Sequence, residues 1–170
     1  MEAAFEEVFL QEHAYVARTL LRLGVGQRDL EDAMQEVFLT VHRKWADYDA
    51  SRPVRPWLFA FAVRHAANYR RLRRHDQDWD AHPESFAGAD DPERSVQRSQ
   101  ARAIVLRALG SLSDDRRAVF VACELDGLPA PEVAEVLAIP VGTVRSRLRT
   151  ARAEFTNAAR RLMADEREVG

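Results

Sequence analysis

The stretch LPAPEVAEVLAIPVGTVRSRLRTAR, residues 128–152, carries the pattern that decides the fold. Its apolar spacing predicts a short helix, PEVAEVLA, a tight connection over 139–142, and a long helix that begins at Thr143. Two helices joined in this way form a helix-turn-helix, in which the second helix enters the major groove of DNA. The residues expected to face each other across the turn are Val133, Ala134, Leu137, Val144, Leu148 and Ala151.

The outward positions of the second helix combine hydroxyl and guanidinium groups, which suit base edges and phosphates. They are Thr143, Arg145, Ser146, Arg147, Arg149 and Arg152. Arginine brings a planar fork that fits guanine edges and phosphate groups. An ordinary helical hairpin with an Arg-rich solvent face is the alternative, because the chain contains only one lysine, Lys44, and uses arginine throughout.

The rest of the chain also shows helical periodicity and no strand signal, so the sequence predicts an all-α protein. Asp29 and Ser113 are expected to cap two of the helices through their side chains, and Gly24, Gly26 and Gly127 to end helices. The expected helices before the helix-turn-helix cover about 2–23, 29–45, 56–75 and 96–109, with one more between Ser113 and Gly127.

A segment without sustained periodicity, DQDWDAHPESFAGADDPE over residues 76–93, separates two helical groups. It is acidic and contains two prolines and a glycine, which is typical of a flexible linker. The predicted organisation is therefore two small helical domains, 1–76 and 96–165, joined by an acidic linker over 77–95.

The net charge of −2, taken as one number, argues against a nucleic-acid partner. Two segments are nevertheless strongly basic, because 51–76 holds seven Arg against one Asp and 141–161 holds six Arg against one Glu. All other segments are acidic on balance. Two cationic modules joined by an acidic linker predict separate anionic contacts. Because the acidic linker is flexible, we also expect the two modules to mask each other's basic surfaces, so that the free chain binds DNA weakly.

Six of the fourteen aromatic residues fall within 45–69, interleaved with arginines. Rings for stacking and guanidinium groups along the backbone are the composition of a surface that binds single-stranded nucleic acid. Some rings must fill the core of the first domain. The Asp47–Arg55 loop and the Arg-rich end of the following helix are therefore the better candidates for contact.

Several classes of function are excluded. No apolar run reaches eighteen residues and the N-terminus lacks a basic and apolar leader, so neither membrane insertion nor export is expected, and the predicted location is cytoplasmic. One cysteine, Cys123, and five scattered histidines give no metal-ligand spacing. No nucleophile and base stand in a recognisable motif, so we expect no enzyme, catalytic residue, metal or cofactor.

Three stretches carry a family resemblance. DLEDAMQEVFLTVHRKWADYD, residues 29–49, and RPWLFAFAVRHAANYRRLRR, residues 55–74, resemble region 2 of bacterial extracytoplasmic-function (ECF) sigma factors, group 4 of the sigma-70 superfamily. Residues 128–152 resemble their region 4. The resemblance covers about 5–75 and 96–161, in the family's order. It implies an alternative sigma factor that binds core RNA polymerase and directs promoter recognition, DNA melting and transcription initiation.

The resemblance also assigns site residues. Region 2 would dock on the clamp helices of the largest polymerase subunit through Asp29, Glu31, Asp32, Gln35, Glu36 and Leu39. It would read the minus-ten element through Asp47, Tyr48, Arg52, Arg55, Trp57, Arg64, Asn68 and Arg71. Region 4 would meet the flap of the second subunit and read the minus-thirty-five element through the outward residues of the helix-turn-helix. An anti-sigma factor is a further expected partner.

The chain departs from the family pattern at three places. Pro129-Ala130-Pro131 stands where a Ser or Thr cap is common, Ala138 where Gly is common, and Thr150 where a basic residue is frequent. Two alternatives remain open at this point. One is a sigma-like decoy that binds an anti-sigma factor and not DNA, and the other is a helix-turn-helix transcriptional regulator of another kind.

Overall fold

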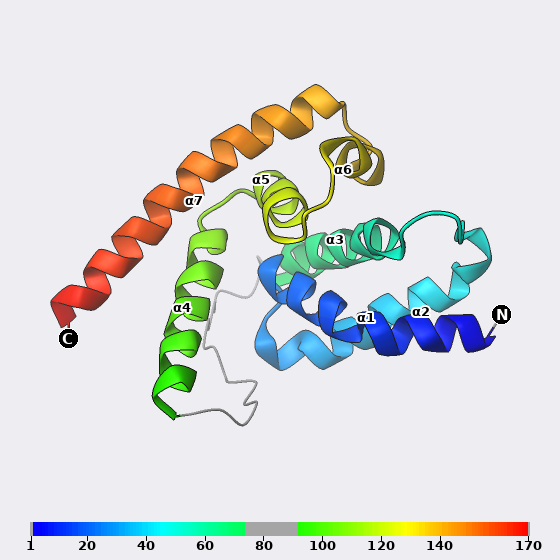
Figure 1. The fold of residues 1–170 in the computed structure, drawn as a ribbon, viewed down its shortest axis with the longest axis horizontal. Coiled ribbons are helices and arrows are strands. Elements are labelled where there is room, and N and C mark those ends of the chain that lie inside the picture. Colours follow the sequence, from blue (N-terminus) through cyan, green and yellow to red (C-terminus); the bar gives the residue numbers. More distant parts are fainter. Residues whose placement is uncertain (1, 74–91, 170) are drawn as a thin grey trace.

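A computed structural model describes residues 2–73 and 92–169, with side chains over 4–73 and 98–165 (Figure 1). Most of the predicted linker, including Trp79 and Phe86, lies outside the described residues, and the domain boundaries stay a prediction. Every regular element within the two described ranges is helical, which confirms the all-α class.

The N-terminal half, described over residues 2–73, forms three helices in that range, α1 (Glu2–Arg22), α2 (Leu30–Arg43) and α3 (Val54–Arg73), with short 3-10 turns at Gln27–Asp29 and Trp45–Asp47. The predicted helices are confirmed here to within a few residues. α1 ends in a Schellman motif, because Gly24 has a φ of +97° and Val25 N donates to Leu20 O at 3.0 Å. This turn brings α2 back against α1.

The C-terminal half contains α4 (Pro92–Gly110), α5 (Asp114–Phe120), α6 (Ala130–Leu137) and α7 (Val141–Val169). The fourth helix begins at Pro92, four residues before the predicted Val96, since proline suits the first turn of a helix. α5 continues into a π-helical turn, Val121–Leu125, that the periodicity did not predict. α7 packs along both α5 and α4 (Figure 1).

The two capping predictions are wrong in their mechanism. Asp29 and Ser113 do occupy the positions before α2 and α5, but neither side chain makes a capping hydrogen bond. The carboxylate of Asp29 instead accepts a hydrogen bond from Tyr69 Oη at 2.7 Å and pairs with Arg73 at 2.7 Å. Asp29 therefore binds side chains of α3, one of them positively charged, in place of the backbone N–H groups at the start of α2.

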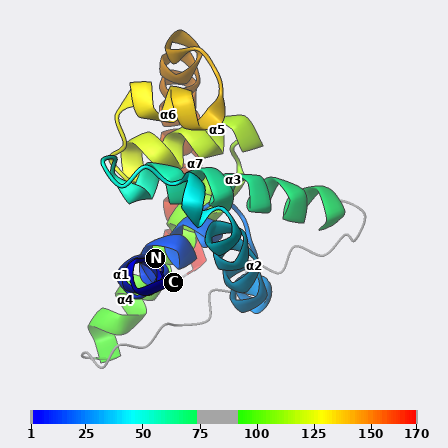
Figure 2. The ribbon, with the colours of Figure 1, turned by 90° about the vertical axis from the view of Figure 1, so that its right-hand side faces the viewer.

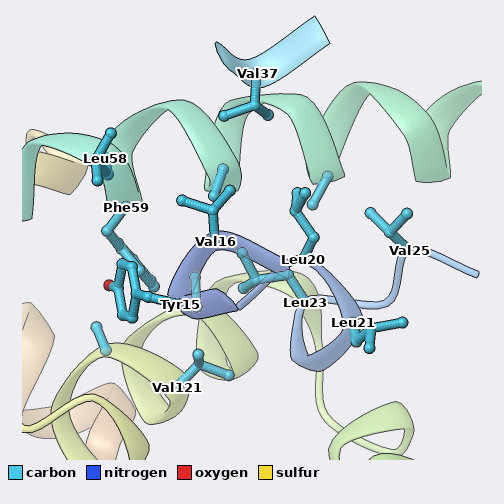
Figure 3. Close-up of a cluster of buried hydrophobic side chains, with 14 of the residues drawn as sticks. Tyr15, Val16, Leu20, Leu21, Leu23, Val25, Val37, Leu58, Phe59 and Val121 are labelled. Carbon is cyan, nitrogen blue, oxygen red and sulfur yellow. The ribbon is translucent and has the colours of Figure 1, made fainter. Parts of the chain in front are cut away.

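The buried side chains form one cluster that runs through both halves, from Tyr15 to Ala151. α1 lies at its centre, with α3 and α2 on one side and the π-helical turn, which carries Val121, on the other (Figure 3). In two perpendicular views α5 and α6 lie on the α3 side of the N-terminal half, away from α2 (Figures 1 and 2). The outer face of α2 is therefore left uncovered by the C-terminal half.

Candidate nucleic-acid and partner interfaces

The loop between α2 and α3 is held in place by aromatic rings. Trp45, Tyr48 and Trp57 contact one another, with centroid distances of 5.0 to 5.9 Å. The Tyr48 hydroxyl also donates to the backbone oxygen of Arg52 at 2.6 Å. Asp47 is exposed and lies 3.5 Å from Lys44 Nζ. The ring cluster gives the loop a defined shape, as a surface that stacks bases requires.

One face of α3 continues from this loop as a polar stripe. Trp57, Arg64, Asn68 and Arg71 follow one another at steps of seven, four and three residues, which places them on one side of the helix. The three polar members are exposed, and no partner is described for them within 4–73 and 98–165. This stripe, called the α3 stripe below, brings together half of the predicted minus-ten residues.

Arg52 and Arg55 point elsewhere. Arg52 pairs with Glu135 of α6 through two hydrogen bonds of 2.7 Å. Arg55 donates to Glu12 of α1 at 2.9 Å, and its guanidinium carbon lies 5.1 Å from the centre of the Tyr15 ring. Both guanidinium groups are thus bound within the chain and would have to leave these partners to contact DNA.

The helix-turn-helix is formed by α6 and the first turns of α7. Val133, Val144 and Ala151 are fully buried, and Ala134, Leu137 and Leu148 are half-buried against the same core, which confirms the predicted inward face. The connection is a second Schellman motif, because Ile139 N donates to Ala134 O at 3.0 Å. Ala138 takes its left-handed position with a φ of +52°, where the family commonly has glycine.

The predicted minus-thirty-five residues fall into two groups on α7. Arg145 and Arg149 are exposed and have no partner among the described residues, and they flank Ser146 on the outermost face. Thr143, at the start of the helix, accepts a hydrogen bond from Ser146 Oγ on its backbone oxygen at 3.1 Å.

Arg147 and Arg152 lie at the two edges of that face. Arg147 pairs with Asp115 at 2.7 Å, and Arg152 donates from Nε to Glu124 at 2.9 Å. Arg145 and Arg149, at the centre of this surface, are thus free to bind DNA. Arg147 and Arg152, at its edges, already form ion pairs within the C-terminal half.

The acidic face of α2 contains five of the six predicted docking residues. Glu31, Asp32, Gln35, Glu36 and Leu39 are all exposed. The side chains behind them, among them Val37 and Phe38, are buried against α1 and α3. Leu39 is 48% exposed at the centre of this face, and only Glu36 has a described partner, His65 at 3.3 Å. Asp29 does not share the face, because Tyr69 and Arg73 hold it half-buried.

Sequence reasoning missed the polar residues between the halves. The Asp126 carboxylate accepts hydrogen bonds from Tyr15, Thr19 and Arg22, at distances of 2.9 to 3.4 Å. Arg117 is buried and donates to the backbone oxygens of Leu23, Gly110 and Leu112. Burial lowers the pKa of Arg117 to about 10, with nearby Arg70 acting in the same direction.

One sequence signal could have pointed to Asp126. Glu124 and Asp126 stand at the end of a helix, where the dipole disfavours negative charge. Such a placement indicates that the carboxylates have partners from elsewhere in the chain. The helical pattern identified neither the partners nor the element that supplies them.

A helix-turn-helix with free arginines and a separate loop of rings and arginines define a DNA-binding transcription factor. Two family models match the chain: sigma-70 region 2 over residues 8–77 and sigma-70 region 4 over residues 102–155. The ECF RNA polymerase sigma-E factor of Escherichia coli strain K12 is 33% identical over 166 residues, covering 92% of this chain and 86% of the relative. The RNA polymerase sigma-H factor of Pseudomonas aeruginosa is 27% identical, covering 95% and 89%.

Two solved structures share the fold. CnrH in complex with the cytosolic domain of CnrY has a TM-score of 0.67 at 25% identity, covering 92% of this chain and 88% of that one. The sigma factor RpoE in complex with the anti-sigma factor NepR, from Bartonella quintana, has a TM-score of 0.71 at 21% identity, covering 92% and 97%.

The chain belongs to the sigma-70 family, and within it to the ECF sigma factors. It is an alternative sigma factor, which binds core RNA polymerase and directs transcription initiation at promoters, and it is not an enzyme. None of the helices in the described residues is long and apolar enough to cross a membrane.

Proposed function

We propose that the N-terminal half docks on the clamp helices of polymerase through the acidic face of α2. A row of acidic side chains around an exposed leucine suits a partner that is basic and partly apolar. The α2–α3 loop and the α3 stripe then take up the melted minus-ten strand, with bases on the rings and phosphates on the arginines. These assignments cover residues 1–76 as region 2.

The C-terminal half, residues 96–165, reads the minus-thirty-five element as duplex while it meets the flap of the second subunit. α7 enters the major groove with Arg145, Ser146 and Arg149 outermost. Arg147 and Arg152, at the edges of the same face, reach the flanking phosphates after exchanging their carboxylate partners. The acidic linker, 77–95, runs between the two halves toward the active-site channel.

The observation that supports this division is the separation of three surfaces. The acidic face lies on α2, the aromatic and basic surface on the α2–α3 loop and α3, and the second basic surface on α7. A decoy would not need free arginines at the centre of its recognition helix. Another kind of helix-turn-helix regulator would leave the aromatic loop and the acidic face without a role.

Run-off transcription on a promoter library, with and without core polymerase, tests the proposal. The full chain with core polymerase should start transcripts at promoters that share two short elements. The chain alone should bind those promoters weakly, because melting requires several contacts besides its own. Tight sequence-specific binding by the isolated chain would contradict the proposed mechanism.

We also propose that the protein works in the cytoplasm and is held inactive there by an anti-sigma factor. The two solved relatives support this, since RpoE is bound by the anti-sigma factor NepR and CnrH by the cytosolic domain of CnrY. Co-purification from its own organism should recover a small partner protein. Repeated recovery of polymerase without such a partner would count against this part of the proposal.

A further inference from the structure

A row of aromatic rings leads from α1 to the loop between α2 and α3. Phe9 of α1 contacts Phe38 of α2, with ring centroids 4.7 Å apart. One turn nearer the N-terminus, Phe5 contacts His42 at 4.8 Å and Trp45 at 5.5 Å, both edge to face. α1 and α2 therefore run in opposite directions along this row, and the start of α1 lies beside the start of the loop (Figure 1).

The row continues through the loop to α3. The ring of Trp45, at the start of the loop, lies 5.2 Å from that of Tyr48 and 5.9 Å from that of Trp57. Tyr48 also lies 5.0 Å from Trp57, which contacts Phe61 at 4.9 Å on the next turn of α3. Phe5 thus contacts one ring of the loop surface proposed to bind the minus-ten strand, and reaches the other rings through it.

The backbone hydrogen bonds of the loop are local. Asp47 N donates to Lys44 O at 2.9 Å and Arg52 N donates to Asp49 O at 3.0 Å, so these bonds stay inside the loop. Among the described residues, the polar side-chain contact that joins the loop to another helix is the pair of Arg52 with Glu135 of α6. Arg52 would have to leave Glu135 to contact DNA. The aromatic contacts would then hold the loop to α1 and α3.

Phe5 belongs to neither of the contact surfaces proposed for the N-terminal half. Its side chain is half-buried and packs against the core. The docking residues are exposed on α2, whereas α2 meets the aromatic row through the buried Phe38 and through His42, which follows the last docking residue, Leu39. A change at Phe5 should therefore act on the loop and leave the docking residues in place.

We propose that Phe5 is a positioning residue for minus-ten recognition: its ring holds Trp45, and through Trp45 the α2–α3 loop, in the arrangement that stacks unpaired bases. The proposal rests on the proposed function, because it assigns the loop to the melted strand. Edge-to-face ring pairs have a preferred geometry as well as a favourable energy. An aliphatic side chain at position 5 would fill the space without fixing the angle of the Trp45 ring.

The test uses the full chain assembled with core polymerase and a pool of fork DNA whose unpaired strand is randomised. Blunt duplex of the same length gives the binding that does not depend on unpaired bases. Phe5→Leu removes the ring and keeps an apolar side chain, whereas Phe5→Tyr keeps the ring. Phe155→Leu is the matched control, because the half-buried Phe155 stacks on Phe120 at 4.6 Å inside the C-terminal half.

We expect Phe5→Leu to lower the ratio of fork to blunt-duplex affinity about five- to tenfold, the lower end of the range for one stacked base. Phe5→Tyr and Phe155→Leu should keep this ratio within about twofold of wild type. Affinity for core polymerase should stay within about twofold in all three variants, since the docking residues are unchanged. Urea unfolding should show similar losses for Phe5→Leu and Phe155→Leu, because each removes one half-buried ring.

A double variant shows whether Phe5 acts through Trp45. Trp45→Leu alone should lower the ratio at least as much as Phe5→Leu does. Adding Phe5→Leu to Trp45→Leu should then change the ratio by less than about twofold, because the effects of residues that act as one unit are not additive.

Four results would overturn the positioning role of Phe5. They are an unchanged ratio in Phe5→Leu, a ratio in Phe5→Tyr as low as in Phe5→Leu, an equal loss in Phe155→Leu, and full additivity with Trp45→Leu. A loss in Trp45→Leu without one in Phe5→Leu would reject this inference and leave the proposed function standing. If Trp45→Leu itself leaves the ratio unchanged, the loop does not take up the unpaired strand, and its proposed function fails together with the inference.

Discussion

A Cβ atom added at Gly24 would lie 2.4 Å from Nη1 of Arg117. Gly24 ends α1 and Arg117 is the buried cation of α5, so the two halves meet here with no room for a side chain. Arg117 also donates to the backbone oxygen of the neighbouring Leu23 at 3.4 Å. The absence of a side chain at Gly24 thus permits both the left-handed turn after α1 and the close approach of the Arg117 guanidinium group.

Gly24→Ala should therefore lower the free energy of unfolding by about 3 kcal/mol, from left-handed strain plus displacement of a hydrogen-bonded buried cation. Gly127→Ala is the matched control. The φ of Gly127 is +69° and nothing lies within 4 Å of an added Cβ. This variant should therefore lose only the free energy of left-handed backbone strain, about 1 kcal/mol. Urea unfolding of both variants measures the difference, and equal losses would contradict the role of Arg117.

Ala138→Gly should stabilise the chain. Ala138 holds the left-handed position of the Schellman motif between α6 and α7, which costs an L-residue about 1 to 2 kcal/mol. Glycine removes that strain but is more flexible in the unfolded chain, so we expect a net gain of about 0.5 to 1 kcal/mol. Thermal and urea unfolding measure it. A loss of stability would show that the methyl group makes a packing contact that outweighs the strain.

Ala138 illustrates how much of this fold could be predicted from local sequence. The helices were predictable because their apolar positions repeat at the helical period, and Gly24 and Gly127 mark two of their ends. The unusual backbone at Ala138 was also signalled, as a departure from the common glycine. These features depend on residues that are close together in the chain.

The contact between the halves was not predictable in the same way. Tyr15 and Asp126 are separated by 111 positions, and nothing in the spacing of either helix specifies the other. The same limit applies to the candidate sites. The composition of α7 identified six outward residues, but only the fold shows that Arg145 and Arg149 are free while Asp115 and Glu124 hold Arg147 and Arg152.

Arg149→Ala should weaken binding of the assembled holoenzyme to the minus-thirty-five duplex. If Arg149 neutralises one phosphate, the slope of log affinity against log salt should fall by about 0.9. Arg160→Ala is the matched control, since Arg160 is also exposed on α7 but lies about 16 Å further along the helix at 1.5 Å per residue. Filter binding across a salt series measures both slopes. Equal slopes in the two variants would show that Arg149 does not contact a DNA phosphate.

Leu39→Ala should weaken the affinity for core polymerase by about five- to tenfold, because an exposed apolar side chain at the centre of an interface loses its burial. Leu10→Ala is the matched control, since Leu10 is 70% exposed on α1 and lies outside the acidic face. Neither change should alter unfolding by more than about 0.5 kcal/mol. Titration of labelled core polymerase measures both affinities, and an equal effect of the two variants would place the docking site elsewhere.

The pH dependence of stability should carry a contribution from Asp126. Burial raises the pKa of this carboxyl above its ordinary value of 3.8, although hydrogen bonds from Tyr15 and Thr19 and the charge of Arg22 oppose the shift. The folded chain therefore keeps the proton at a pH where the unfolded chain has released it. By linkage, the free energy of unfolding falls as the pH rises from about 3.8 through the raised value.

Asp126→Asn has no proton to lose and so removes this contribution, while the other carboxyl groups, Glu135 among them, remain common to both proteins. The stability of wild type minus that of Asp126→Asn should therefore decrease as the pH rises from 4 toward neutrality and then level off. Urea unfolding of both proteins at half-unit pH steps measures the difference. A difference that grows with pH would mean that the donors on α1 lower the pKa of Asp126 by more than burial raises it. The folded chain would then prefer the ionised carboxylate.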